Sequence, residues 1–123
     1  MKVYVAGNPK HSLVKLLEVM GAVEAAGHTI SYDWLRRFPP KVEQTRRSIA
    51  ELDMKGVKEA DALVLVDTQA QSWGMYVELG AALALGKKVA ILHPGYQQVF
   101  YSLPQVHMCV SLPEVLVYLG NKK

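Results

Sequence analysis

Apolar residues follow two patterns along the chain, short continuous runs and longer stretches with helical spacing. The runs KVYVAG (2–7), HTISYDW (28–34), ALVLVD (62–67), KVAILHP (88–94) and QVHMCVS (105–111) each predict a β-strand. Helices are predicted over residues 13–27, with Ser12 as the cap and Gly27 as the stop, and over 42–60, 74–85 and 112–120. The prolines of RRFPPK (36–41) predict a loop, and residues 95–104 predict a loop or a short helix.

Strands and helices therefore alternate along the chain, which is typical of an α/β fold with a parallel sheet. We predict a flavodoxin-like or Rossmann-like three-layer sandwich, with five parallel strands in the order 2-1-3-4-5 and helices on both faces, formed by a single domain of residues 1–123. In such sheets ligands bind outside the carboxyl ends of the strands, where the strand order reverses. This location selects the loops GNPKHS (7–12), RRFPP (36–40) and TQAQSWG (68–74).

Composition and charge limit the binding partners and the cellular location that we expect. The net charge of +3 is too small to indicate binding to a nucleic-acid polymer, although five basic residues fall close together: Arg36, Arg37, Lys41, Arg46 and Arg47. Cys109 is the only cysteine, which excludes an intrachain disulfide and a cysteine-built metal site. No apolar run has the length of a signal peptide or a membrane span, so we expect a cytoplasmic protein without a membrane partner.

One carboxylate interrupts the most apolar predicted helix. Between Trp73 and Gly86 the only charged residue is Glu78, one turn from the start of the helix. A helix that is apolar on every side is normally enclosed within a protein, and the helix dipole favours an anion near the N-terminus. We therefore predict a functional role for Glu78, against the alternative of a buried hydrogen-bonding residue.

A second acid lies on the inward side of the preceding helix. Asp53 falls in the same helical arc as Ile49, Gly56 and Val57, whereas an acid on such an arc is uncommon unless it is paired or catalytic. The alternative is a structural pair with Arg46, or a cap. Two partly buried carboxylates beside one cleft suit glycosidic chemistry, in which one acts on the anomeric carbon and the other works with protons. No histidine stands near either acid at ligand spacing, so we predict no metal.

The loop after the first strand offers groups that suit an anion. Gly7, Asn8, Lys10 and Ser12 provide backbone donors, side-chain donors and a cation ahead of a helix N-terminus, and Ser72 lies in the facing loop. An ordinary strand-to-helix turn would have the same composition, so the residues alone leave both interpretations open.

Three blocks together resemble the nucleoside 2-deoxyribosyltransferase superfamily. They are VYVAG with Tyr4, ELDMKGVKEAD with Asp53, and GMYVELGAALALGKKV, which begins at Gly74 and contains Glu78. The match spans roughly residues 2–94. The resemblance implies that Glu78 is a nucleophile that forms a covalent glycosyl-enzyme, that Asp53 protonates or orients the base, and that Tyr4 holds the nucleophile.

The resemblance also implies a branch and a substrate. Six positions before the glutamate the true transferases carry an acid, whereas the 2′-deoxynucleoside 5′-phosphate N-hydrolases carry serine, as Ser72 here. Lys10 occupies the place of an arginine that those hydrolases carry. A hydroxyl donates to a phosphate that a carboxylate would repel. We therefore expect hydrolysis of a (2′-deoxy)nucleoside 5′-monophosphate, without a cofactor.

Other expectations rest on less of the sequence. Trp34 and Trp73 are candidates for stacking on a base, and each is equally compatible with a core position. The resemblance fades after Pro94, and it implies that Ser102 contacts phosphate across a homodimer or a higher homo-oligomer. Base transfer is the nearest alternative activity; SWGMYVE (72–78) also resembles the Ser, Trp and Glu of NAD-cleaving Toll/interleukin-type receptor domains, and a non-catalytic nucleotide-binding module is a further alternative.

Overall fold

The computed structural model describes residues 1–36, 45–67, 72–93, 95 and 98–120. Its elements are β1 (Lys2–Gly7), α1 (Pro9–Ala25), β2 (Thr29–Ile30), α2 (Arg46–Glu59), β3 (Ala62–Val66), α3 (Trp73–Ala84), β4 (Lys88–Leu92), the 3-10 helix η1 (Val99–Ser102), β5 (Val106–Cys109) and α4 (Leu112–Leu119). The five strands form one sheet in the order β2-β1-β3-β4-β5, and every neighbouring pair is parallel. The predicted fold class and strand order are confirmed.

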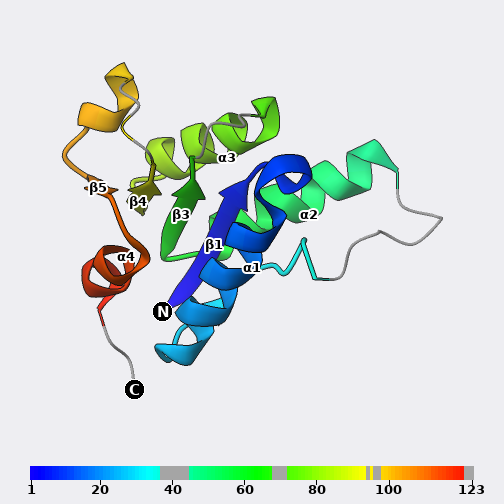
Figure 1. The fold of residues 1–123 in the computed structure, drawn as a ribbon. Helices are drawn as coiled ribbons and strands as arrows, with labels where there is room; N and C mark the ends of the chain where they lie inside the picture. Colours follow the sequence, from blue (N-terminus) through cyan, green and yellow to red (C-terminus); the bar gives the residue numbers. More distant parts are fainter. Residues whose placement is uncertain (37–44, 68–71, 94, 96–97, 121–123) are drawn as a thin grey trace.

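Alternate residues of the strands build a core on each face of the sheet. Val3, Val5 and Val64 pack with apolar residues of α1 and α4, whereas Tyr4 and Leu63 pack with residues of α2 and α3. Strands β1, β3 and β4 are buried on both faces because helices cover both, which gives the three layers seen in Figure 1. The covered faces explain why these strands are continuous apolar runs.

The ends of several elements differ from the prediction. Asn8, not Ser12, caps α1: its side chain accepts a hydrogen bond from the Lys10 backbone N–H, and Pro9 occupies the first turn. Ser12 lies buried inside α1 at a non-helical backbone conformation, where two helical segments meet at a kink. The predicted second strand shrinks to Thr29–Ile30 because the chain turns before Trp34, whose backbone N–H donates to the Tyr32 carbonyl.

The composition of helix α3 led us to expect that it is enclosed on every side, but the structure shows that it is not. Met75, Leu79 and Ala82 are buried against the sheet, but the Trp73 side chain is 91% exposed and that of Val77 is 62% exposed. Within the described part of the chain, an apolar stripe of α3 that includes Trp73 and Val77 is therefore left uncovered. No helix among the described residues is both long and apolar enough to cross a membrane.

Candidate active site

Tyr4 and Glu78 meet beneath the junction of β1 and α3. Tyr4 points from β1 into the core that α2 and α3 cover, and its side chain is fully buried. Its hydroxyl donates a hydrogen bond of 2.5 Å to Oε2 of Glu78, which stands in the second turn of α3 and is half-buried. The lone charge of α3 therefore faces inward, toward the sheet, rather than the exposed stripe.

The surroundings of Glu78 favour its protonated form. Burial is the largest influence and raises the pKa of its carboxyl to about 7; the Tyr4 hydrogen bond acts in the opposite direction, and the charge of Asp53 adds a smaller increase. Burial, then the charge and the hydrogen bond of Glu78, raise the pKa of Tyr4 well above its ordinary value. Tyr4 is thus a permanent donor, and Glu78 is an acid that titrates near neutral pH.

Asp53 approaches the same pair from α2. Its Oδ1 is buried and has no hydrogen-bond partner among the described residues, and burial raises the pKa of its carboxyl. Among the described residues no ion pair joins Asp53 to Arg46, which is exposed, so the structural pair that we considered is not present. A buried oxygen that lacks a hydrogen bond is costly in a protein interior, so this carboxylate is a candidate for contact with a ligand.

Gly56 brings α2 close enough for Asp53 to reach the pair. A Cβ at Gly56 would lie 2.6 Å from the Tyr32 Cβ and 3.0 Å from two ring atoms of Tyr4. The Gly56 carbonyl also accepts a hydrogen bond of 2.8 Å from the Ser31 hydroxyl. Asp53 lies one turn earlier on the same face of α2, so the absence of a side chain at Gly56 sets how near its carboxylate comes to Tyr4 and Glu78.

The loop after β1 lies at the carboxyl edge of the sheet. Gly7 pairs with Val66 in the sheet, and a Cβ there would lie 2.8 Å from a methyl group of Leu16, so close packing with α1 accounts for this glycine. Asn8 and Ser12 are buried, whereas Lys10 is exposed. The N-terminus of α1 therefore meets the edge where β1 and β3 end, as the sequence led us to expect.

The N-terminus of α3 opens onto the same edge. The Ser72 side chain caps the helix by accepting a hydrogen bond of 3.3 Å from the Met75 backbone N–H. Trp73 is exposed, and a Cβ at Gly74 would meet no atom within 4 Å. No contact within the described ranges therefore requires a glycine at position 74.

Trp34 and Ser102 have structural contacts of their own. The Trp34 indole N–H donates a hydrogen bond of 2.7 Å to the Val5 carbonyl, and its ring packs against both cores. The Ser102 hydroxyl donates to the Val99 carbonyl at 2.6 Å, within η1. Among the described residues no hydrogen bond joins Ser102 to Glu78, Asp53 or Tyr4, so its expected contact with a ligand stays a prediction.

A group that the sequence did not single out lies at the end of β3. The carboxylate of Asp67 is 1% exposed and accepts hydrogen bonds from the hydroxyls of Tyr76, on α3, and Tyr101, on η1. The available signal was weak: an acid directly after a buried strand, at the edge where ligands bind. The tyrosines stand 9 and 34 positions away, so their convergence on Asp67 follows only from the fold.

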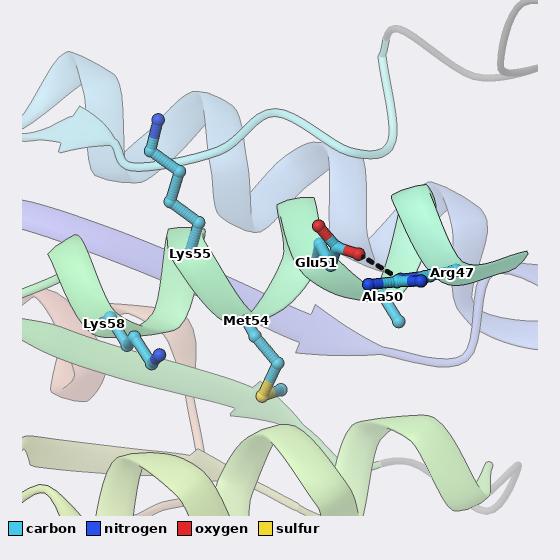
Figure 2. A pocket seen from close by; sticks show the side chains of 6 residues that line it. All are labelled: Arg47, Ala50, Glu51, Met54, Lys55 and Lys58. Carbon is cyan, nitrogen blue, oxygen red and sulfur yellow. Dashed lines mark hydrogen bonds and ion pairs between the residues drawn. The ribbon is translucent and has the colours of Figure 1, made fainter. Parts of the chain in front are cut away.

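Two hollows lie outside this group. One of about 540 Å³ follows the outer side of α2, where Arg47 pairs with Glu51 and Met54 points toward α3 (Figure 2). The other, of about 600 Å³, lies between the outer side of α3 and η1, and its lining includes Leu83 and Phe100. Within the described ranges no three His, Cys, Asp or Glu side chains are grouped in a way that would hold a metal ion.

The comparisons with known proteins give one family match and several solved structures of similar fold. The family model described as nucleoside 2-deoxyribosyltransferase matches residues 3–113. No curated protein matches the chain in sequence. Among solved structures, a 2-deoxyribosyltransferase from Bacillus psychrosaccharolyticus is similar with a TM-score of 0.78 and 20% identity, over 94% of this chain and 90% of the other. The CMP N-glycosidase BcmB of Clostridium botulinum is similar with a TM-score of 0.71 and 20% identity, over 97% and 98%.

Proposed function

We propose, from the premise that the chain belongs to the nucleoside 2-deoxyribosyltransferase family, that it hydrolyses the N-glycosidic bond of a (2′-deoxy)nucleoside 5′-monophosphate. The products are the free base and (deoxy)ribose 5-phosphate. The observation that carries this proposal is the Tyr4–Glu78 pair: the single acid of an apolar helix is turned inward, held by a buried hydroxyl, and faced by a second carboxylate.

The proposed reaction has two steps. The Glu78 carboxylate attacks the anomeric carbon, the bond from that carbon to the base breaks, and its electron pair leaves with the base, which takes a proton from Asp53. Water then attacks the same carbon, the bond to Glu78 breaks, and Asp53 recovers a proton from the water. The raised pKa of Asp53 suits its role, because Asp53 must carry a proton to give. Glu78 reacts as the carboxylate, so its pKa of about 7 predicts that the rate rises with pH as this group loses its proton.

The phosphate site is proposed at the edge where α1 and α3 begin. Helix N-termini favour anions, because their backbone N–H groups point outward and the helix dipole is positive there. Lys10 supplies a cation, and the Ser72 hydroxyl, which uses an acceptor position for capping, keeps its proton to donate. A carboxylate at position 72 would repel the phosphate, so Ser72 favours a monophosphate over a free nucleoside.

Base transfer is the second candidate, because the family model that matches residues 3–113 is described as nucleoside 2-deoxyribosyltransferase. It differs from hydrolysis only in the second step, where a second base replaces water at the anomeric carbon. Product analysis with and without an added acceptor base separates the two activities.

The proposal includes a homodimer that covers the exposed stripe of α3. The side chain of Trp73 is 91% exposed and that of Phe100, across the neighbouring hollow, is 58% exposed. Exposed apolar groups of this size are unusual in a monomer and typical of an interface. Sedimentation analysis of the wild-type chain and of Trp73→Ser tests this part of the proposal, which a monomeric wild-type chain would contradict.

The central experiment is a panel of nucleosides, nucleoside 5′-monophosphates and NAD, scored by chromatography for released base. We expect base release from monophosphates, and its loss in Glu78→Ala, while the circular dichroism spectrum stays that of the folded protein. Glu59→Ala is the matched control, since it removes an exposed acid from α2. Near-normal activity of Glu78→Ala would remove the nucleophile assignment, and a panel without turnover would remove the proposed function.

A further inference from the structure

Asp67 connects three parts of the molecule at the carboxyl edge of the sheet. Its backbone N–H donates a hydrogen bond of 2.7 Å to the Leu92 carbonyl, which extends the ladder between β3 and β4. Its Oδ1 accepts from the Tyr76 hydroxyl at 3.4 Å and its Oδ2 accepts from the Tyr101 hydroxyl. Because β3 is the central strand of the sheet, Asp67 is a fixed point to which α3 and η1 are both attached.

Tyr76 and Glu78 hold α3 from nearly opposite sides. They are two positions apart on the helix, which separates their side chains by about 200° around its axis. Glu78 is bound by Tyr4 on one side, and Tyr76 is bound to Asp67 on the other. The Ser72 side chain caps the first turn of α3. The first two turns of α3 are therefore constrained in rotation as well as in position.

We propose that Asp67 is a positioning residue that fixes the rotation of α3 through Tyr76, is itself oriented by Tyr101, and thereby keeps Glu78 in contact with Tyr4. This inference rests on the proposed function only as far as it concerns the rate of the reaction. The position of Glu78 against Tyr4 is a property of the folded chain, whatever the substrate.

The geometry makes the rotation of α3 important. Side-chain atoms lie about 5–6 Å from the axis of a helix, so a rotation of about 10° moves a carboxylate by roughly 1 Å. A displacement of that size is enough to lower the rate of an enzyme by as much as about 100-fold. It would also lengthen the 2.5 Å bond between Tyr4 and Glu78 beyond the range of a strong hydrogen bond.

The first test measures Glu78 itself and needs no turnover. We would follow the titration of the Glu78 carboxyl carbon by NMR in the wild-type chain and in Tyr76→Phe, which keeps the ring and removes the hydroxyl. The Tyr4 hydrogen bond lowers the pKa of Glu78, so weakening this bond in a site that stays buried raises the midpoint. We expect a rise of about half a pH unit. An unchanged or lower midpoint would overturn the proposal.

The second test separates positioning from stability. Tyr76→Phe is expected to lower kcat about tenfold and to leave KM within about twofold, because the ground-state contacts of the substrate lie elsewhere. Tyr118→Phe is the matched control: its hydroxyl likewise donates a hydrogen bond, to the Gln105 carbonyl at 2.9 Å, and it belongs to α4 on the other face of the sheet. Equal effects of the two variants on kcat would refute a positioning role.

A further variant keeps the test decisive if Tyr76→Phe does not fold. Tyr101→Phe removes the other donor to Asp67 and should produce the same change in the Glu78 titration, to a smaller extent. If the wild-type chain releases no base from any compound of the panel, the proposed function fails, while the Glu78 titration still decides the role of Asp67. A shift in the titration without any turnover would retain the positioning role alone.

Discussion

The raised pKa of Glu78 predicts how the stability of the protein changes with pH. The substitution Glu78→Gln keeps the size of the side chain and an oxygen that accepts from Tyr4, but removes the ionisable group. In the wild-type chain the carboxyl has a pKa of about 7 when folded and an ordinary value of 4.5 when unfolded, because burial penalises its charged form. The folded state therefore holds this proton more tightly than the unfolded state.

The sign and the size follow from linkage. A pKa that is higher in the folded state stabilises the protein below the unfolded value, and the stabilisation is lost as the pH rises through the folded value. From 4.5 to about 7 the wild-type chain should lose about 3 kcal/mol relative to Glu78→Gln, at about 1.4 kcal/mol for each pH unit. The stabilising contribution of Asp53 is also lost as the pH rises, since its pKa is raised as well. Because Asp53 is present in both proteins, this contribution largely cancels in the comparison.

Urea denaturation at pH 4, 5, 6, 7 and 8.5 provides the measurement. The free energy of unfolding of each protein is extrapolated to water, and the difference between the two proteins is plotted against pH. We expect the free energy of unfolding of Glu78→Gln to rise relative to that of the wild-type chain between pH 4.5 and 7. Above about pH 8 the difference should stay constant. A difference that stays flat over the whole range would show that Glu78 titrates as an exposed acid, and the description of the site would be wrong.

Three further substitutions test single contacts. Asp53→Asn should lower kcat for base release about 100-fold with normal folding, measured by chromatography, and an unchanged rate would return Asp53 to a structural role. Gly56→Ala should destabilise the chain by about 1–3 kcal/mol in urea denaturation, because its Cβ would overlap that of Tyr32, whereas Gly80→Ala, where a Cβ meets no atom within 4 Å, should not. Ser72→Asp retains a capping side chain but should lower kcat/KM for the monophosphate relative to the nucleoside; an unchanged ratio would exclude a phosphate contact at this position.

The positions of the central strands were predictable because their signal is local, whereas their order was taken from the order common in chains that alternate strands and helices. Strands covered on both faces are continuous apolar runs, and β1, β3 and β4 have that pattern. The length of the edge strand β2 was overestimated. Trp34, which the predicted strand included, lies outside β2, and its indole N–H donates to the Val5 carbonyl. The cap of α1 was misassigned because Asn8 and Ser12 are both good capping residues, and only the position of Pro9 in the first turn distinguishes them.

Part of the site was predictable for a different reason. Glu78 and Asp53 stand out because each is an acid among apolar neighbours, and a charge in such a place requires an explanation. Asp67 follows a strand, where polar residues are ordinary, and its significance depends on Tyr101, which the chain reaches only after β4, within η1. The exposed stripe of α3 could not be predicted either, because the sequence does not distinguish an apolar residue that its own chain buries from one that stays exposed.

The bond between Tyr4 and Glu78 joins residues that are 74 positions apart, and they meet only after β3 has been laid beside β1. Contacts over such long intervals form late when a chain folds, because the intervening segment must first lose its freedom. Recovery of the Tyr4–Glu78 contact after dilution from denaturant thus reports that β1, β3 and α3 have come together, and an intermediate in which these elements are apart lacks this contact.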